Sequence, residues 1–425
     1  MNYQIKRNLS SINILTIILI INLVSHIFQN LFSFGNTYWF SYCCWLLLIV
    51  YQLFIGIRSN RNENISFFLV AIGSMIGGII GVISGYLEPE DYFKVGFYLI
   101  AVISSKVVHT NFSLYIKNIK VLMLVIWSIA ITALLYLLFV QGNLIVPSLQ
   151  GDEYAQWGLY SFFRQRNIYA GFNLFAIMST LFLYRLSKRK IYLISIVAFF
   201  SIIVCTGSRA ALFSVLLFLA TYIFLRTKNK WLLVSVAVIA LVFIISQFEL
   251  LNFLQMKFYH STSSGVDSGM IRIMMWKAGL EKLWGNFTLI TGYGVGASSI
   301  FLRKSGFTVE SFHNVYMEFF FEGGIIQLMF IFISLKDSLK YIFKSKEKLY
   351  KETWGAIVIA YIFYNMFESG SAIYMSNYLS VLATIMIIII PRYMYQTESQ
   401  YQNQRNEIRE KKNKTVVKNF RLKCI

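Results

Sequence analysis

The sequence predicts an all-α integral membrane protein, built as a bundle of about twelve transmembrane helices with one large periplasmic loop. Three observations predict this class. The chain is 57% hydrophobic and only 14% charged. Its apolar runs are long enough, at roughly 17 to 25 residues, to cross a hydrocarbon core about 30 Å thick. These runs are continuous rather than alternating, which favours helices over a transmembrane β-barrel.

The apolar runs define the predicted spans in chain order. The first run follows Lys6 and Arg7, as a signal peptide would, but no small-residue cleavage site follows it, so we expect an uncleaved helix. The predicted spans are 9–28, 38–57, 65–87, 92–108, 121–140, 168–184, 191–206, 210–225, 231–247, 314–335, 354–374 and 377–395.

Basic residues predict the orientation of the bundle. They gather in alternate connections, which the positive-inside rule places in the cytoplasm together with both termini. The net charge of +20 is therefore mostly a topology signal, and the basic tail favours contact with anionic lipid over nucleic acid. The predicted parts are 1–247 with nine spans and short loops, the extracytoplasmic loop 248–313 with an interfacial helix, 314–395 with three spans, and the cytoplasmic tail 396–425.

Polar residues that could carry chemistry lie on the predicted outer side. Arg209 stands in a short break between two spans, after Thr206-Gly207-Ser208 and before Ala210-Ala211. A cation at or just below the membrane surface is costly and usually functional, and small neighbours let a ligand approach. The alternative is that the Arg209 side chain snorkels to the membrane interface and has no functional role.

The large loop contains a predicted helix that begins near Met270, with Ser268 as its cap. Arg272 lies in its first turn and points away from the apolar face, so it is either a ligand for an anion or a solvated cation. The apolar face suits contact with the bilayer or the bundle and consists of Ile273, Trp276, Leu280, Leu283 and Trp284.

A glycine run, Gly292-Tyr293-Gly294-Val295-Gly296, follows that helix. It resembles a dinucleotide-binding fingerprint, but no strand–turn–helix unit surrounds it. We therefore expect a tight turn that brings backbone N–H groups near an anion.

His313 and Asn314 stand where the loop re-enters the membrane, followed by Glu318 and Glu322 at helical spacing. A histidine at a helix start can be a cap or an interface residue, but the nearby arginine-bearing segments favour a functional role. Further residues enter the sixth span from the same side and could complete a cationic pocket: Arg164, Arg166 and Asn167.

This set of side chains predicts a site for a lipid-linked pyrophosphate. Guanidinium groups grip phosphate oxygens bidentately, and they would stabilise charge that develops on a leaving pyrophosphate. His313 could accept the proton of an acceptor hydroxyl or hold that hydroxyl in line. No acidic pair with metal-ligand spacing is evident, so neither a metal nor a cofactor is expected.

These features together resemble the O-antigen polymerase and O-antigen ligase superfamily, in topology and in the order of the motifs around Arg209, Arg272 with Trp276, the glycine run, and His313-Asn314 with Glu318. The resemblance implies a metal-independent glycosyltransferase that takes a glycan from undecaprenyl diphosphate at the outer face of a bacterial inner membrane. It also implies that Arg209 and Arg272 hold the diphosphate and that His313 lies at the glycan acceptor. We expect Arg164, Arg166, Asn167, Asn314 and Glu318 to bind substrate, and a chain-length regulator is a candidate partner.

The two branches of that superfamily differ after the histidine. In the ligase pattern a Gly-Thr pair stands where this chain has Gln327-Leu328, although Gly324 fits the pattern. This departure favours a repeat-unit polymerase over a ligase that transfers glycan to lipid A core. A lipid-linked oligosaccharide flippase or other transporter, and a non-enzymatic scaffold, remain alternatives from other classes.

Overall fold

The computed structural model describes residues 14–32, 38–54, 61–107, 116–150, 152–163, 165–227, 268–375 and 377–395. Every regular element within those ranges is helical, which confirms the predicted all-α class. The predicted ninth span 231–247, the first part of the large loop and the basic tail lie outside the described residues.

The described part of the chain forms long helices joined by short helical turns. The long helices are α2 (Ile14–Phe32), α3 (Tyr38–Phe54), α4 (Arg61–Ile83), α5 (Phe93–Val107), α6 (Ile116–Val140), α9 (Arg166–Ser187), α10 (Lys190–Thr206), α11 (Arg209–Arg226), α14 (Ser268–Leu283), α17 (Val315–Lys344) and α18 (Lys348–Tyr364). The shorter elements are η1 (Pro89–Tyr92), η2 (Gly142–Leu144), α7 (Ile145–Leu149), α8 (Glu153–Gly158), α15 (Thr288–Thr291), α16 (Ala297–Lys304), α19 (Tyr378–Ala383) and the π-helical turn η3 (Thr384–Ile389).

Several of these helices are suited to a membrane by length and composition. Among the described residues five are long and apolar enough to cross one: Lys117–Val140, Arg166–Ser187, Arg209–Arg226, Val315–Lys344 and Tyr378–Tyr395. Shorter apolar helices occur at Thr16–Ser25, Phe68–Ile83, Phe93–Ser104 and Lys190–Thr206. This composition indicates a membrane protein, while the number of about twelve spans stays a prediction.

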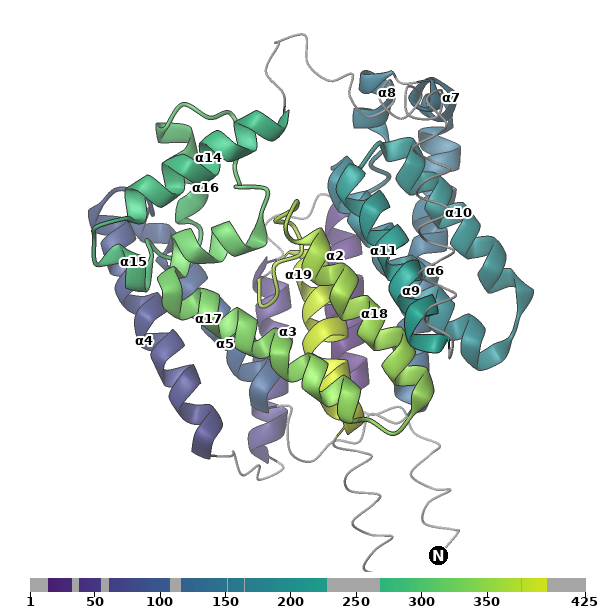
Figure 1. Cartoon of the computed structure of the whole chain (residues 1–425), viewed down its shortest axis with the longest axis horizontal. Helices are drawn as coiled ribbons and strands as arrows, with labels where there is room; N and C mark the ends of the chain where they lie inside the picture. The colour runs from purple at the N-terminus through teal and green to yellow at the C-terminus, as the bar shows by residue number, and fades with distance from the viewer. Residues whose placement is uncertain are drawn as a thin grey trace, which may run out of the picture.

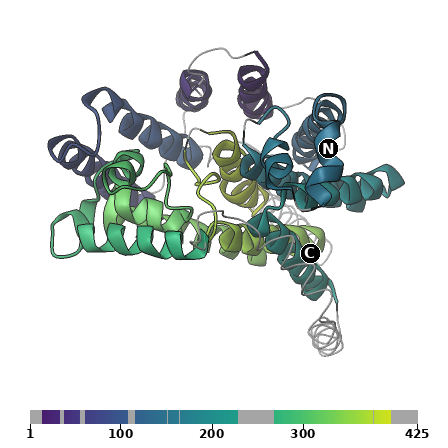
Figure 2. The same ribbon diagram turned by 90° about the horizontal axis from the view of Figure 1, so that it is seen from above.

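Two groups of helices lie on either side of α17 and α18 (Figures 1 and 2). On one side α4 lies with α14, α15 and α16, and on the other α6 lies with α9, α10 and α11. The central helices join the two groups, because α17 packs against α4 and α15 while α18 packs against α11 and α17. Residues far apart in the sequence therefore meet where α17 begins and α18 ends.

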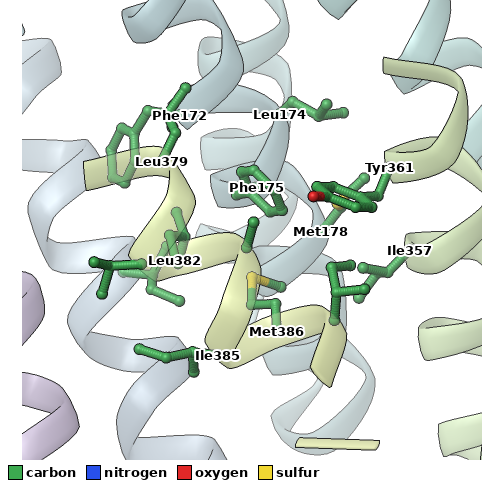
Figure 3. Close-up of a cluster of buried hydrophobic side chains, with 14 of the residues drawn as sticks. Phe172, Leu174, Phe175, Met178, Ile357, Tyr361, Leu379, Leu382, Ile385 and Met386 are labelled. Atoms are coloured by element: carbon green, nitrogen blue, oxygen red, sulfur yellow. The ribbon is translucent and has the colours of Figure 1, made fainter. Parts of the chain in front are cut away.

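The helix α9 is buried along most of its length. Figure 3 shows Phe172, Phe175 and Met178 of this helix against Tyr361 of α18 and Met386 of η3. The indole Nε1 of a neighbouring α18 residue, Trp354, donates to the Met386 carbonyl at 3.0 Å. Helices in lipid associate through close van der Waals contact, so this packing holds α9, α18 and η3 together.

The helix α17 is kinked at Gly324, whose φ of 61° and ψ of −162° are not helical. This conformation is essentially restricted to glycine. A Cβ at Gly324 would lie 2.2 Å from the carbonyl oxygen of Ile290, so α17 and α15 approach each other through bare backbone. The predicted span 314–335 is thus a bent helix that continues to Lys344.

The predicted span 354–374 was wrong in its extent, because α18 ends at Tyr364 and a turning segment follows. Polar side chains favour that turn over a continued helix. The Asn365 amide donates to the Tyr361 carbonyl at 3.0 Å, and the Ser371 hydroxyl donates to Asn365 Oδ1 at 2.7 Å. Irregular backbone of this kind is tolerated at membrane depth where protein surrounds it.

An ion pair joins the C-terminal end of α9 to the N-terminal end of α18. Arg185 of α9 lies 3.2 Å from the buried carboxylate of Glu352 on α18, and it also donates to the hydroxyl of Tyr222 on α11. Removing one member of such a pair leaves a buried charge uncompensated, so the contact holds the three helices in register.

Candidate functional site

The helix α14 places Arg272 on its inward face. Met275 and Leu283 are buried on that face, whereas Ile273, Leu280 and Trp284 are exposed. The predicted apolar face is therefore divided, with Leu283 and Trp276 on the protein side. The prediction that Arg272 points away from this face was wrong, because residues 272, 276 and 283 lie within a narrow arc of the helix at about 100° per residue. The inward face includes Gly279, where a Cβ would meet the ring of Phe312 at 2.9 Å, so α14 lies directly over the turn before His313.

Arg272 and Trp276 attach α14 to the site. The guanidinium of Arg272 is half-buried and donates to the carbonyl oxygen of Phe367 at 3.0 Å. The indole Nε1 of Trp276 donates to the carbonyl oxygen of Phe312 at 2.8 Å. Arg272 is therefore not a freely solvated cation.

Arg209 begins α11 and is exposed. The break before it turns at Gly207, which has a φ of +64°. A Cβ there would lie 2.5 Å from the side-chain oxygen of Gln156, so α8 covers this break closely. Burial lowers the pKa of the Arg272 guanidinium, the Glu368 carboxylate opposes that shift, and the charge of Arg209 adds to it. The structure thus brings the two predicted arginines within electrostatic reach of each other.

The segments 311–315 and 365–369 lie against each other and run in opposite directions. The backbone N–H of Val315 donates to the Asn365 carbonyl at 2.9 Å, and at the other end the side chain of Ser369 donates to that of Ser311 at 2.8 Å. His313 stands midway along the first segment. This pairing fixes where the imidazole lies relative to the end of α18.

His313 itself has a φ of +50°, a conformation uncommon for a residue with a side chain. Its imidazole is partly exposed, with a side-chain accessibility of 29%, while Nδ1 is buried and makes no hydrogen bond to any described residue. Nδ1 lies 3.7 Å from a carboxylate oxygen of Glu368, a side chain that is only 9% accessible. The strained turn therefore directs one ring nitrogen at a buried acid.

Asn314 and Glu318 hold the turn that carries His313. The Asn314 side chain caps α17 by accepting from the N–H groups of Tyr316 at 2.9 Å and Met317 at 3.1 Å. Glu318 accepts from the Phe312 N–H at 3.0 Å through one oxygen and from the Ser298 hydroxyl through the other. Both residues were predicted to bind substrate; the contacts in the structure are internal and support the position of His313.

The glycine run 292–296 forms the predicted tight turn against α17. The N–H of Gly294 donates to the Glu322 carbonyl at 2.7 Å, and the N–H of Gly296 donates to the Glu322 carboxyl at 2.8 Å. Gly292 has a φ of +69°, and a Cβ there would lie 2.3 Å from the carbonyl carbon of Glu322. The acidic group that this turn meets is thus a side chain of the protein itself.

Arg166 and Asn167 begin α9 on the same side of the molecule. The guanidinium of Arg166 lies 4.6 Å from the centre of the Trp157 ring, a cation–π contact. The carbonyl oxygen of Asn167 accepts from the Tyr364 hydroxyl at 3.4 Å, next to the segment that carries Glu368. Arg164 lies outside the described residues.

Glu368 is the acidic residue of this site that the sequence reasoning missed. The sequence contains a signal for it, since an ionisable residue within an apolar run is a functional candidate, but the hydropathy of 354–374 predicts an uninterrupted span. Within the described ranges no group of three or more His, Cys, Asp and Glu side chains could hold a metal ion. The residues that come together are Arg209, Arg272, His313 and Glu368.

Comparison with known families agrees with the motifs. Residues 194–332 match the family model described as O-Antigen ligase, which supports the O-antigen polymerase and ligase superfamily. No curated protein sequence matches the chain. The matched region includes Arg209, Arg272 and His313 and ends before Glu368.

Proposed function

Since residues 194–332 carry an O-antigen ligase family domain, we propose that the protein is a repeat-unit polymerase for O-antigen or a related surface polysaccharide. The donor is a glycan on undecaprenyl diphosphate, and the acceptor is a second lipid-linked repeat unit. Members of this family are membrane enzymes of the glycosyltransferase type, which agrees with the apolar helices of the chain.

The observation that carries the proposal is the convergence of Arg209, Arg272 and His313 from three separate parts of the matched region. Arg272 uses one N–H on the Phe367 carbonyl, and a guanidinium has five N–H donors in all. Its remaining donors can therefore face a ligand. Two guanidiniums within electrostatic reach repel each other, and a diphosphate between them would relieve that repulsion.

The arrangement supports direct transfer of the glycan. The acceptor hydroxyl oxygen forms a bond to the anomeric carbon of the donor sugar, and the bond from that carbon to the phosphate oxygen breaks. The electron pair leaves with the diphosphate, where Arg209 and Arg272 stabilise the charge. The hydroxyl proton passes to a ring nitrogen of His313, which acts as the general base.

The proposed location follows the predicted topology. The site lies at the outer face of the bacterial inner membrane, where the lipid-linked donor is presented, and both termini lie in the cytoplasm. The substrate-binding roles of Arg164, Arg166 and Asn167 belong to the same proposal, as does a chain-length regulator as partner. No step needs a metal ion, because the arginines supply the positive charge at the leaving group.

A ligase is the second candidate, because the matched family bears that description. The preference for a polymerase comes from Gln327-Leu328 in place of Gly-Thr. Gln327 is only 1% accessible and lies at the kink of α17, where a Cβ on Gly323 would come within 1.6 Å of its side-chain oxygen. A glycine in place of Gln327 would leave this space beside the kink empty.

The surface glycans of a strain that lacks this protein test the choice. Loss of a polymerase leaves surface lipid that carries a single repeat unit, because a separate ligase still attaches what is available. Surface lipid with no repeat, together with long polymer on undecaprenyl diphosphate, would instead identify the ligase. Lipid-linked single units retained on the cytoplasmic side would identify a flippase.

A further inference from the structure

We propose that Glu368 is a positioning residue for His313: its carboxylate accepts a hydrogen bond from Nδ1–H and thereby presents Nε2 to the acceptor hydroxyl. This inference rests on the proposed glycosyl transfer and adds a residue from outside the matched region 194–332.

The first support is the unmet hydrogen-bonding capacity of the imidazole. Among the described residues Nδ1 of His313 is buried and makes no hydrogen bond, and an unpaired buried polar atom is destabilising. A Glu368 oxygen at 3.7 Å is the acidic group facing it. This separation exceeds a hydrogen bond, but catalytic hydrogen bonds are often long without substrate and shorten when it binds.

The second support is the way the two residues are held. Contacts between segments 311–315 and 365–369 lie on both sides of the pair, at Val315 with Asn365 and at Ser311 with Ser369. The Arg272 bond to the Phe367 carbonyl fixes the backbone immediately before Glu368. The carboxylate is thus placed by three contacts that do not involve its own side chain.

The pairing decides which nitrogen can act as the base. A neutral imidazole carries one proton, and the hydrogen bond made by one nitrogen leaves the other free to accept. With the proton on Nδ1 directed at Glu368, Nε2 takes the proton of the acceptor hydroxyl and the ring becomes an imidazolium. The Glu368 carboxylate stabilises that positive charge, and water removes the proton from Nε2 after the product leaves.

Other charges also act on His313 and must be held constant in a test. Glu368 faces it from the segment after α18, and Glu318 acts on it electrostatically from α17. Arg272 of α14 interacts with Glu368, and Arg209 of α11 interacts with Arg272. A substitution at Glu368 could therefore act through Arg272 as well, and the assay must separate the two routes.

The experiment measures transfer by purified protein in liposomes, using lipid-linked oligosaccharide extracted from a strain that lacks the gene as donor and acceptor. The variants are Glu368→Gln, which removes the charge, and Glu368→Asp, which keeps it. Glu310→Gln is the matched control, because Glu310 is exposed in the same loop as His313. For each variant kcat and KM are determined.

We expect Glu368→Gln to lower kcat by about 10- to 100-fold, within the range that general base catalysis contributes, and to change KM less than twofold. Glu368→Asp recovers part of kcat, because it keeps a carboxylate opposite Nδ1. Glu310→Gln behaves as wild type.

Three outcomes would overturn the inference. One is an unchanged kcat in Glu368→Gln while the wild type transfers glycan. The second is a raised KM with an unchanged kcat, which would place Glu368 with Arg272 at the donor. The third is a lowered kcat with no recovery in Glu368→Asp, which would mean a purely structural role. Failure of the wild type itself to transfer would refute the proposed function, so the two failures are distinguishable.

Discussion

Replacing Arg272 with alanine tests the proposed diphosphate site. The substitution removes a half-buried guanidinium that is held by the Phe367 carbonyl and lies within electrostatic reach of Arg209 and Glu368. A hydrogen bond to a charged group contributes about 1.5–3 kcal/mol. Since about 1.4 kcal/mol corresponds to a factor of ten, we expect kcat/KM to fall by about 10- to 100-fold from the phosphate contact alone.

The loss should be larger than that figure, because the alanine variant also releases Phe367 and with it the backbone before Glu368. Arg272→Lys should recover only part of the activity, since an ammonium is a point charge and cannot make the paired contacts of a guanidinium. Arg209→Ala should show a comparable loss, and the double variant should lose less than the sum if both bind one diphosphate.

The assay is glycan transfer in liposomes at matched protein content, with Lys277→Ala as the control. Lys277 lies on the same helix but is exposed, with a side-chain accessibility of 74%. The control should transfer at the wild-type rate. Wild-type transfer by Arg272→Ala, in protein that is folded and inserted, would remove this arginine from the site.

Three further predictions concern the fold, the topology and the chemistry. Gly324→Ala should lower the melting temperature, because its backbone conformation alone costs about 1–3 kcal/mol for a residue other than glycine. The control Gly142→Ala should leave the melting temperature unchanged, because the space around Gly142 is open. Equal melting temperatures for the two variants would contradict the kink. In a cysteine-free background, a cysteine at Thr308 should react with an impermeant thiol reagent in spheroplasts and one at Lys346 should not; the reverse pattern would invert the topology. A chelator should leave transfer unchanged, and a loss that added Mg²⁺ restores would contradict metal independence.

Hydropathy predicted most of the helical framework because a span is a property of many residues together. The ends of α9, α10 and α11 lie within a few residues of the predicted spans 168–184, 191–206 and 210–225. A single polar residue changes the average hydropathy of such a run very little. The extent of the span 354–374 was therefore wrong, since Asn365 and its neighbours form side-chain hydrogen bonds that end α18 early.

The candidate site was predictable where a residue type carries an intrinsic chemical meaning. Arg209, Arg272 and His313 stood out because cations and an imidazole beside a membrane surface are costly, and the structure places them near one another. The pairing of Glu368 with His313 could not be predicted from the sequence, because it depends on the antiparallel arrangement of two segments about 50 residues apart. The inward direction of Arg272 likewise depends on which face of α14 packs against Phe312.

Transfer by the purified protein is the most direct measurement of the central claim. The protein is placed in liposomes with a lipid-linked single repeat unit, without nucleotide or ion gradient, and the products are resolved by length. We predict lipid-linked glycans of two and more repeat units, together with released undecaprenyl diphosphate. Unchanged single units, with or without their movement across the bilayer, would contradict the assignment as a polymerase.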